Sequence, residues 1–296
     1  MKRKLLFFFI IVELALILFL AQDIYKKYSV SKQASVSIIE RETIAFPGGG
    51  LKYFYEPLAV SDSIYTINSD TLNDGSEYQT QKPENTYRIV VMGDSVTFGL
   101  YVNTKDSYPE VLERLLNNAS CRNTFEVINL GMRGYDIRYT LERYKLRGAK
   151  YNPDLAIWFV QQGNFSKIQE LIQEKVNAQY KTGSPEENAV RAQADIISVV
   201  GEKNIVEYQS SFLKDFAKLH KKEFVMYSFK DGLWGEPEGQ VRNFTEKYPL
   251  GHFYKTALDL KKNGALFPDA HPNKKGYLLM AQDLFDYLWQ NNIIPC

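Results

Sequence analysis

The fold is decided by the stretch RIVVMGDSVTFG, residues 88–99. Its first part, Ile89 to Met92, is an apolar run typical of a strand buried on both faces of a parallel sheet. The glycines at 93 and 99 let the backbone turn sharply after this strand. Because ligands bind beyond the carboxyl ends of parallel strands, Ser95 lies where a catalytic residue is expected. The stretch alone leaves two interpretations open, a nucleophile or a small polar residue in a tight turn.

From residue 87 onward, short apolar runs alternate with longer amphipathic segments, a pattern typical of βαβ units. Further strands are predicted at 125–130, 155–160 and 224–229. A capping box at 107–110 predicts a helix over 108–118. More helices are predicted at 141–148, 168–176, 189–200, 205–219 and 275–290. The sequence therefore predicts an α/β fold with a parallel sheet, and the long helical stretch from 166 to 222 indicates a lid or an insertion.

Composition limits the class of protein. The 296 residues, 45% of them hydrophobic, suffice for one sizeable α/β domain with appendages. Lys and Arg total 36 against 35 Asp and Glu, so the chain lacks the positive field that nucleic acid binding requires, and no nucleic acid partner is expected. Cys121 and Cys296 form no CxxC motif. They join in one disulfide in an oxidising compartment or remain two buried thiols.

The N-terminus predicts a membrane anchor. The run from Leu5 to Ala21, interrupted only by Glu13, spans roughly 26 Å as a helix, close to the thickness of a bilayer core. The three basic residues at 2–4 favour a cytoplasmic N-terminus and export of the remainder to the periplasm or the cell exterior. A cleaved signal peptide is the alternative, but the length of the apolar run favours an uncleaved signal-anchor.

The predicted organisation has four parts: a cytoplasmic tail (1–4), a transmembrane signal-anchor (5–21), a juxtamembrane stalk and N-terminal extension (22–84), and a folded domain (85–296). The glycines at 48–50 lack the Gly-Lys-Ser/Thr ending of a phosphate loop and indicate a hinge. Residues 61–87 are rich in Ser, Asn, Asp and Thr, which predicts a segment lying across the surface of the domain.

A nucleophilic serine needs a base, and the chain has three histidines. His220 lies among lysines at a predicted helix end, which indicates solvated surface. His252 has no acid beside it, which leaves a structural or substrate-contact role. His271 precedes the last helix, and Asp269 can orient its imidazole because residues i and i+2 of an extended segment share a face. By elimination, His271 is the predicted base.

Two other predicted strand ends offer donors to an oxyanion: segment 129–134 a glycine amide, and segment 161–164 a side-chain amide. Each alone indicates a turn. Together with Ser95 and His271 they form a set that fits acyl transfer. An α/β-hydrolase fold is disfavoured, because the chain contains no GxSxG motif.

Over about residues 85–292 the sequence resembles the SGNH hydrolases, also called the GDSL lipase/esterase superfamily. Gly93-Asp94-Ser95 matches the first block, with Ser95 as nucleophile and oxyanion donor. Gly134 matches the second-block amide donor, Asn164 the third-block asparagine, and His271 the fifth-block base. The resemblance implies a flavodoxin-like three-layer α/β/α sandwich. It also implies hydrolysis or transfer of an ester-linked acyl group without a metal or other cofactor.

Two departures from the family pattern stand out. In the third block, Gln162 stands at the position of the usual glycine and Phe165 at that of the usual aspartate. In the fifth block, Pro268 occupies the position of the acid three residues before the base, and Asp269 lies only two before it. Asp269 is the predicted acid, with Asp259 or a backbone carbonyl as the alternative orienting group.

These observations predict a membrane-anchored serine esterase that removes an ester-linked acyl group, such as O-acetyl, from a small molecule or an O-acylated glycan. An envelope or extracellular glycan follows from the predicted location alone. Three alternatives stay open: an SGNH-type O-acyltransferase acting on a polysaccharide, an inactive glycan-binding or assembly protein, and a lipase acting on the bilayer.

Overall fold

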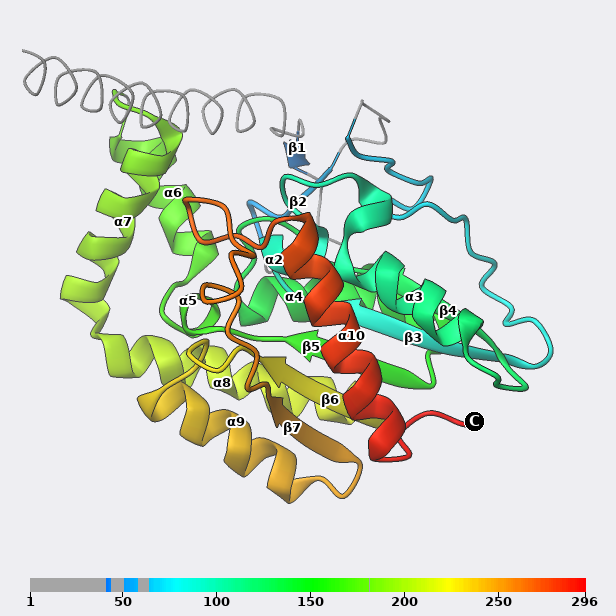
Figure 1. Cartoon of the computed structure of the whole chain (residues 1–296). Helices are drawn as coiled ribbons and strands as arrows, with labels where there is room; N and C mark the ends of the chain where they lie inside the picture. The colour runs from blue at the N-terminus through cyan, green and yellow to red at the C-terminus, as the bar shows by residue number, and fades with distance from the viewer. Residues whose placement is uncertain (1–40, 44–50, 58–63, 181) are drawn as a thin grey trace, which may run out of the picture.

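A computed structural model describes residues 41–43, 51–57, 64–180 and 182–296. The central sheet of this part of the chain consists of β3 (Thr86–Met92), β4 (Thr124–Asn129), β5 (Leu155–Phe159), β6 (Glu223–Ser228) and β7 (Gly251–Lys255). These strands are parallel and lie in the order β4-β3-β5-β6-β7 (Figure 1). Numbered from β3, the order is 2-1-3-4-5, which is flavodoxin-like. The predicted α/β fold with a parallel sheet is confirmed.

Helices cover both faces of this sheet. One face is covered by α3 (Tyr108–Asn118) and α10 (Lys274–Gln290). The other face is covered by α4 (Ile137–Arg143), α8 (Glu202–Leu219) and α9 (Gly235–Lys247). Along β3, Ile89 and Val91 pack into the first layer, whereas Val90 and Met92 pack into the second. This alternation is the period of two expected for a strand buried on both sides.

The helical stretch between β5 and β6 divides into two parts. The helices α6 (Gln169–Gln179) and α7 (Pro185–Val200) pack on one another around a small hydrophobic cluster that includes Ile172 and Ile196 and, from the start of α8, Ile205. The next helix, α8, belongs to the regular layer against the sheet. The predicted insertion is therefore the α6–α7 pair, and α8 is part of the basic fold.

Shorter helical segments complete the domain. They are α2 (Ser95–Phe98), η1 (Thr104–Asp106), the π-helix η2 (Tyr144–Gly148), η3 (Ala149–Tyr151) and α5 (Gln162–Phe165). The helix predicted at 141–148 is thus the end of α4 continued by η2, and it starts earlier than predicted. Among the strands of the central sheet and the helices packed against it, β7 and α9 have no predicted counterpart.

The segment that precedes β3 is packed into the domain. A short antiparallel pair joins β1 (Arg41–Thr43) to β2 (Tyr55–Pro57). Glu56 of β2 is 1% exposed and accepts hydrogen bonds from Arg143 at 2.6 Å and from Arg147 at 2.5 Å. Further along, Leu72 and Asn73 are completely buried. The predicted surface position of residues 61–87 is therefore wrong for its central part, because these side chains fill the domain's interior.

The predicted cytoplasmic tail, the predicted transmembrane segment and most of the predicted stalk lie outside the described residues. Among the helices that the structure does describe, none combines the length and the apolar character needed to cross a bilayer.

A disulfide joins Cys121, which follows α3, to Cys296 at the end of the chain. Of the two states left open by the sequence, the structure has the cross-linked one. The bond fastens the segment after α10 to the loop that enters β4, and it closes a loop with a sequence separation of 175 residues. A cross-link of this kind lowers the entropy of the unfolded chain.

Removing this cross-link is expected to destabilise the domain. The double variant Cys121→Ser/Cys296→Ser should lose about 2 to 4 kcal/mol of unfolding free energy, because its unfolded state regains loop entropy. Thermal unfolding followed by circular dichroism measures the loss. Dithiothreitol should lower the midpoint of the natural chain and leave that of the double variant unchanged. Equal midpoints for all samples would show that the cysteines are unpaired in solution.

A second prediction concerns Glu113 of α3, whose carboxylate accepts a hydrogen bond from the backbone of Val127 at 2.6 Å. Burial raises the pKa of Glu113 to about 7, and the neighbouring Glu110 and Glu126 add to the shift. Because the folded-state pKa lies above the unfolded value of about 4.3, the contribution to stability is complete below that value and is lost as the pH rises through about 7.

Glu113→Gln keeps the acceptor for Val127 and removes the titration. Its unfolding free energy should therefore fall less steeply than that of the natural chain between pH 4.5 and 7. Urea unfolding at several pH values measures the slopes. Glu246→Gln, at an exposed position of α9, is the matched control and should leave the slope unchanged. Parallel pH profiles for Glu113→Gln and the natural chain would contradict the raised pKa.

Candidate active site

Ser95 is the first residue of α2, directly beyond the carboxyl end of β3. Asp94 caps this short helix by accepting a hydrogen bond from the backbone of Val96 at 3.0 Å. The turn requires Gly93, because a Cβ atom there would lie 2.3 Å from Oγ1 of Thr97. The sequence RIVVMGDSVTFG thus forms a strand, a tight turn and one helical turn that presents Ser95 at the edge of the sheet.

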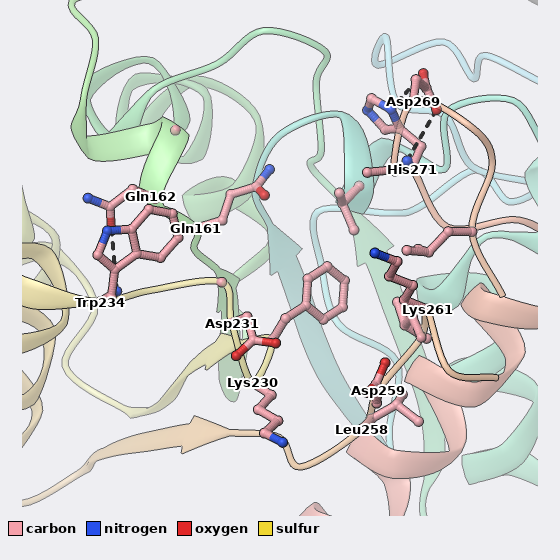
Figure 2. A pocket seen from close by; sticks show the side chains of 17 residues that line it. Gln161, Gln162, Lys230, Asp231, Trp234, Leu258, Asp259, Lys261, Asp269 and His271 are labelled. Atoms are coloured by element: carbon pink, nitrogen blue, oxygen red, sulfur yellow. Dashed lines mark hydrogen bonds and ion pairs between the residues drawn. The ribbon is translucent and has the colours of Figure 1, made fainter. Parts of the chain in front are cut away.

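Ser95, His271 and Asp269 form a hydrogen-bonded chain. Oγ of Ser95 lies 2.8 Å from Nε2 of His271, and Nδ1 of His271 lies 3.0 Å from Oδ2 of Asp269 (Figure 2 shows the latter pair). An ionised carboxylate can only accept, so Nδ1 carries the proton and Nε2 is left to accept the serine hydroxyl. This is the arrangement that a serine nucleophile and its general base require.

A turn in the loop before α10 brings Asp269 to His271. The backbone N–H of Ala270 donates to Phe267 at 3.0 Å, and that of Phe267 donates to His271 at 2.7 Å. Ala270 has a φ of +70°, which costs a non-glycine residue about 1 to 2 kcal/mol. The predicted extended segment is therefore wrong, although the carboxylate of Asp269 reaches the ring of His271. Asp259, the alternative orienting acid, instead accepts from a backbone N–H three residues further on.

The backbone N–H groups of Ser95 and Gly134 are available at this edge of the sheet. None of the hydrogen bonds within the described residues uses either group. Ser95 starts α2, where helical N–H groups have no partner in the helix. Gly134 follows β4 with a φ of +84°, in a loop that approaches α2 so closely that a Cβ on Gly131 would lie 2.2 Å from the nitrogen of Phe98. Both groups can donate to an oxyanion.

Asn164 is buried on α5 and is fully engaged. Its Nδ2 donates to Oδ2 of Asp94 at 2.9 Å and to the carbonyl of Tyr135 at 3.1 Å. Its Oδ1 accepts from the backbone of Gln161 at 2.8 Å. The side chain thereby ties together the loops after β3, β4 and β5. Because both amide hydrogens are used, donation to an oxyanion requires the exchange of one partner, and that role of Asn164 stays a prediction.

Gln161 and the two unusual third-block residues, Gln162 and Phe165, have distinct contacts. Gln161 donates from Nε2 to Oδ2 of Asp94 at 2.5 Å, so this carboxylate oxygen accepts from both Gln161 and Asn164. Oε1 of Gln162 accepts from the backbone of Trp234 at 3.4 Å. Phe165 is completely buried in the hydrophobic layer formed with α4, α8 and α9. Gln161 therefore supports the turn that carries Ser95, Gln162 contacts the loop after β6, and Phe165 fills the core.

The other histidines lie away from this chain of hydrogen bonds. His220 is only 5% exposed, so its predicted solvated position is wrong. Nδ1 of His220 lies 3.0 Å from the hydroxyl of Tyr144, and Nε2 lies 2.9 Å from the carbonyl of Glu223. Burial lowers the pKa of the His220 ring. His252 pairs with the Glu223 carboxylate at 2.8 Å, at the amino end of β6 and thus at the opposite edge of the sheet from Ser95. Both have structural roles.

Tyr101 is a site residue that the sequence did not reveal. Its ring stands edge-on to His271, with 5.4 Å between the ring centroids. Burial raises the pKa of Tyr101, and the charge of Asp269 together with a hydrogen bond to it raises the pKa further. Tyr101 therefore contacts both His271 and Asp269. It lies in an irregular loop after α2, where no pattern distinguishes a functional tyrosine from a packed one.

A cavity of about 470 Å³ opens beside His271. Apolar side chains that line it include Val96, Phe229 and Leu266, and its charged side chains are Lys230, Asp231, Asp259, Lys261 and Asp269. Trp234 lies at the side of the cavity away from His271 and Asp269 (Figure 2). Within the described residues, no group of three or more His, Cys, Asp or Glu side chains is arranged to hold a metal ion.

No protein-family model and no curated protein matches the sequence. Solved structures with a similar fold include the acetylxylan esterase Axe2 from Geobacillus stearothermophilus, which is 16% identical and has a TM-score of 0.43. That match covers 68% of this chain and 93% of the esterase. The lipase/acylhydrolase from Enterococcus faecalis has 14% identity, coverages of 69% and 96%, and a TM-score of 0.42.

A family two carbohydrate esterase from Clostridium thermocellum, solved with cellohexaose, has 16% identity and a TM-score of 0.40. The match covers 70% of this chain and 64% of that one, less than two thirds of its length. The resemblance to SGNH hydrolases extends from the sequence blocks to the sheet order and to the gathering of the blocks at one edge of the sheet.

The role of Asp269 is open to a direct test against Asp259, a second carboxylate of the same cavity. Asp269→Asn should lower kcat for an activated ester on the order of 10³-fold, because the imidazole loses the acceptor that fixes its tautomer. Asp259→Asn should stay within about twofold, because its carboxylate is bonded to its own loop. Steady-state hydrolysis of 4-nitrophenyl acetate measures both. The reverse order of the two effects would assign the acid to Asp259.

Proposed function

We propose that the chain is a carboxylic ester hydrolase of the SGNH type that removes a short acyl group from an O-acylated glycan. The observation that carries this proposal is the hydrogen-bonded chain from Ser95 through His271 to Asp269, beside two backbone N–H groups that are free to bind an oxyanion. Acyl transfer requires a nucleophile, an oriented base and preorganised hydrogen-bond donors at one place.

The chemistry follows from these contacts. Nε2 of His271 accepts the proton of Ser95 as Oγ attacks the ester carbonyl, and the amides of Ser95 and Gly134 bind the resulting oxyanion. Asp269 stabilises the imidazolium, which then gives its proton to the departing alkoxide. Water attacks the acyl-enzyme with His271 again as base, and the carboxylic acid leaves. Asn164 joins the oxyanion donors when one of its amide hydrogens leaves Asp94 or Tyr135.

The proposed location is the membrane, with a single pass, a cytoplasmic N-terminus and the domain in the periplasm or outside the cell. The apolar run at 5–21 and the basic residues before it support this orientation. The Cys121–Cys296 disulfide supports it independently, because such bonds persist mainly in oxidising compartments. An enzyme held there meets glycans of the envelope or the exterior.

Covalent labelling tests the proposal and separates it from an inactive binding protein. The full-length chain in detergent should react with a fluorophosphonate probe at Ser95, because the probe requires an activated serine hydroxyl. Ser95→Ala should abolish both the labelling and the hydrolysis of 4-nitrophenyl acetate, whereas Ser198→Ala, an exposed serine of α7, should change neither. An unlabelled natural chain, or labelling that survives in Ser95→Ala, would contradict the proposal.

A further inference from the structure

We infer that Trp234 is the platform on which a sugar ring of the substrate stacks, so that an ester on the glycan reaches Ser95. The inference rests on the proposed function and deepens it. The sugar that carries the ester binds at the Trp234 side of the cavity. The substrate class is a neutral O-acylated oligosaccharide.

The first argument is the exposure of Trp234. Aromatic side chains bury 150–250 Å² each when packed, so large exposed rings are costly and often mark binding sites. Trp158 is 1% exposed in the core, but Trp234 is 58% exposed and lines the cavity that also contains His271. In Figure 2 the ring lies beside Gln162, across the cavity from His271. A ligand that touches both residues spans the cavity.

The second argument is that the backbone on both sides of the ring is fixed. The N–H of Trp234 donates to the side chain of Gln162 at 3.4 Å, and the N–H of Gln162 donates to Gly232 at 2.7 Å. Leu233 is completely buried, and its carbonyl accepts from Lys255 at 2.8 Å. The backbone that carries the ring is therefore held in place, while the ring itself remains exposed to solvent. Such preorganisation reduces the entropy lost on binding.

The third argument concerns the charges around the cavity. Lys230, Asp231 and Lys261 are exposed, and no ion pair within the described residues involves them. Because both signs are present, the cavity has no strong field that would favour a polyanion. A pyranose ring has an apolar C–H face and a rim of hydroxyls, which matches a flat aromatic surface surrounded by separate hydrogen-bonding groups.

The test compares a glycan ester with an ester that has no sugar. For chemically O-acetylated cello-, xylo- and manno-oligosaccharides, Trp234→Ala in the full-length chain should lower kcat/KM about fivefold to tenfold, mainly through KM. Hydrolysis of 4-nitrophenyl acetate should stay within about twofold. Trp234→Phe should lower kcat/KM less than Trp234→Ala does, because an aromatic ring remains. Trp289→Ala removes a tryptophan that is 42% exposed on α10, outside the cavity, and should affect neither substrate.

Calorimetry of Ser95→Ala with the oligosaccharides gives a second readout that needs no turnover. Binding should be measurable and should weaken about fivefold to tenfold when Trp234→Ala is added. Equal losses on both esters, unchanged oligosaccharide kinetics, or no saccharide binding would each overturn the inference. Hydrolysis of 4-nitrophenyl acetate that depends on Ser95 would in those cases leave the proposed esterase intact, whereas its absence from the natural chain would overturn the proposed function itself.

Discussion

The carboxylate of Asp94 is the group on which the arrangement of the site depends. It is 4% exposed, and it accepts from the backbone of Val96 on one side and from the side chains of Asn164 and Gln161 on the other. A buried carboxylate without donors would cost several kcal/mol, so the turn after β3 and the turn after β5 can only be placed together. The position of Ser95 is thus set by the contacts of Asp94 with the residues that follow β5.

The sequence predicted those parts of the fold that local patterns encode. The strands β3 to β6 are apolar runs because both of their faces are covered. The helix α3 begins after Ser107 as predicted, with a proline in its first turn, although the Ser107 side chain makes no capping hydrogen bond. The edge strand β7 is half-buried along its length and contains no apolar run, so it was missed. The N-terminal extension was misjudged for a related reason. Glu56 is charged, and its burial depends on the distant partners Arg143 and Arg147.

The site was predictable to the extent that chemistry restricts the choice of residues. A serine after a buried strand and a small number of histidines single out Ser95 and His271, which the structure brings within 2.8 Å. The path by which Asp269 reaches the ring was not predictable, because alanine at a φ of +70° leaves no sequence signal. The burial of His220 was equally unpredictable from the sequence, because its ring is hydrogen-bonded to residues of separate elements.

The donors that Asp94 needs explain how Asn164 can change partners. Gln161 binds the same carboxylate oxygen as Asn164. If Asn164 turns one amide hydrogen toward an oxyanion, Asp94 keeps Gln161 and stays paired, so the exchange does not leave a buried charge unsatisfied. Phe165 in turn needs no polar partner in its apolar layer, where a buried aspartate would need several. The support of Ser95 therefore depends on Gln161 as the second side-chain donor to Asp94.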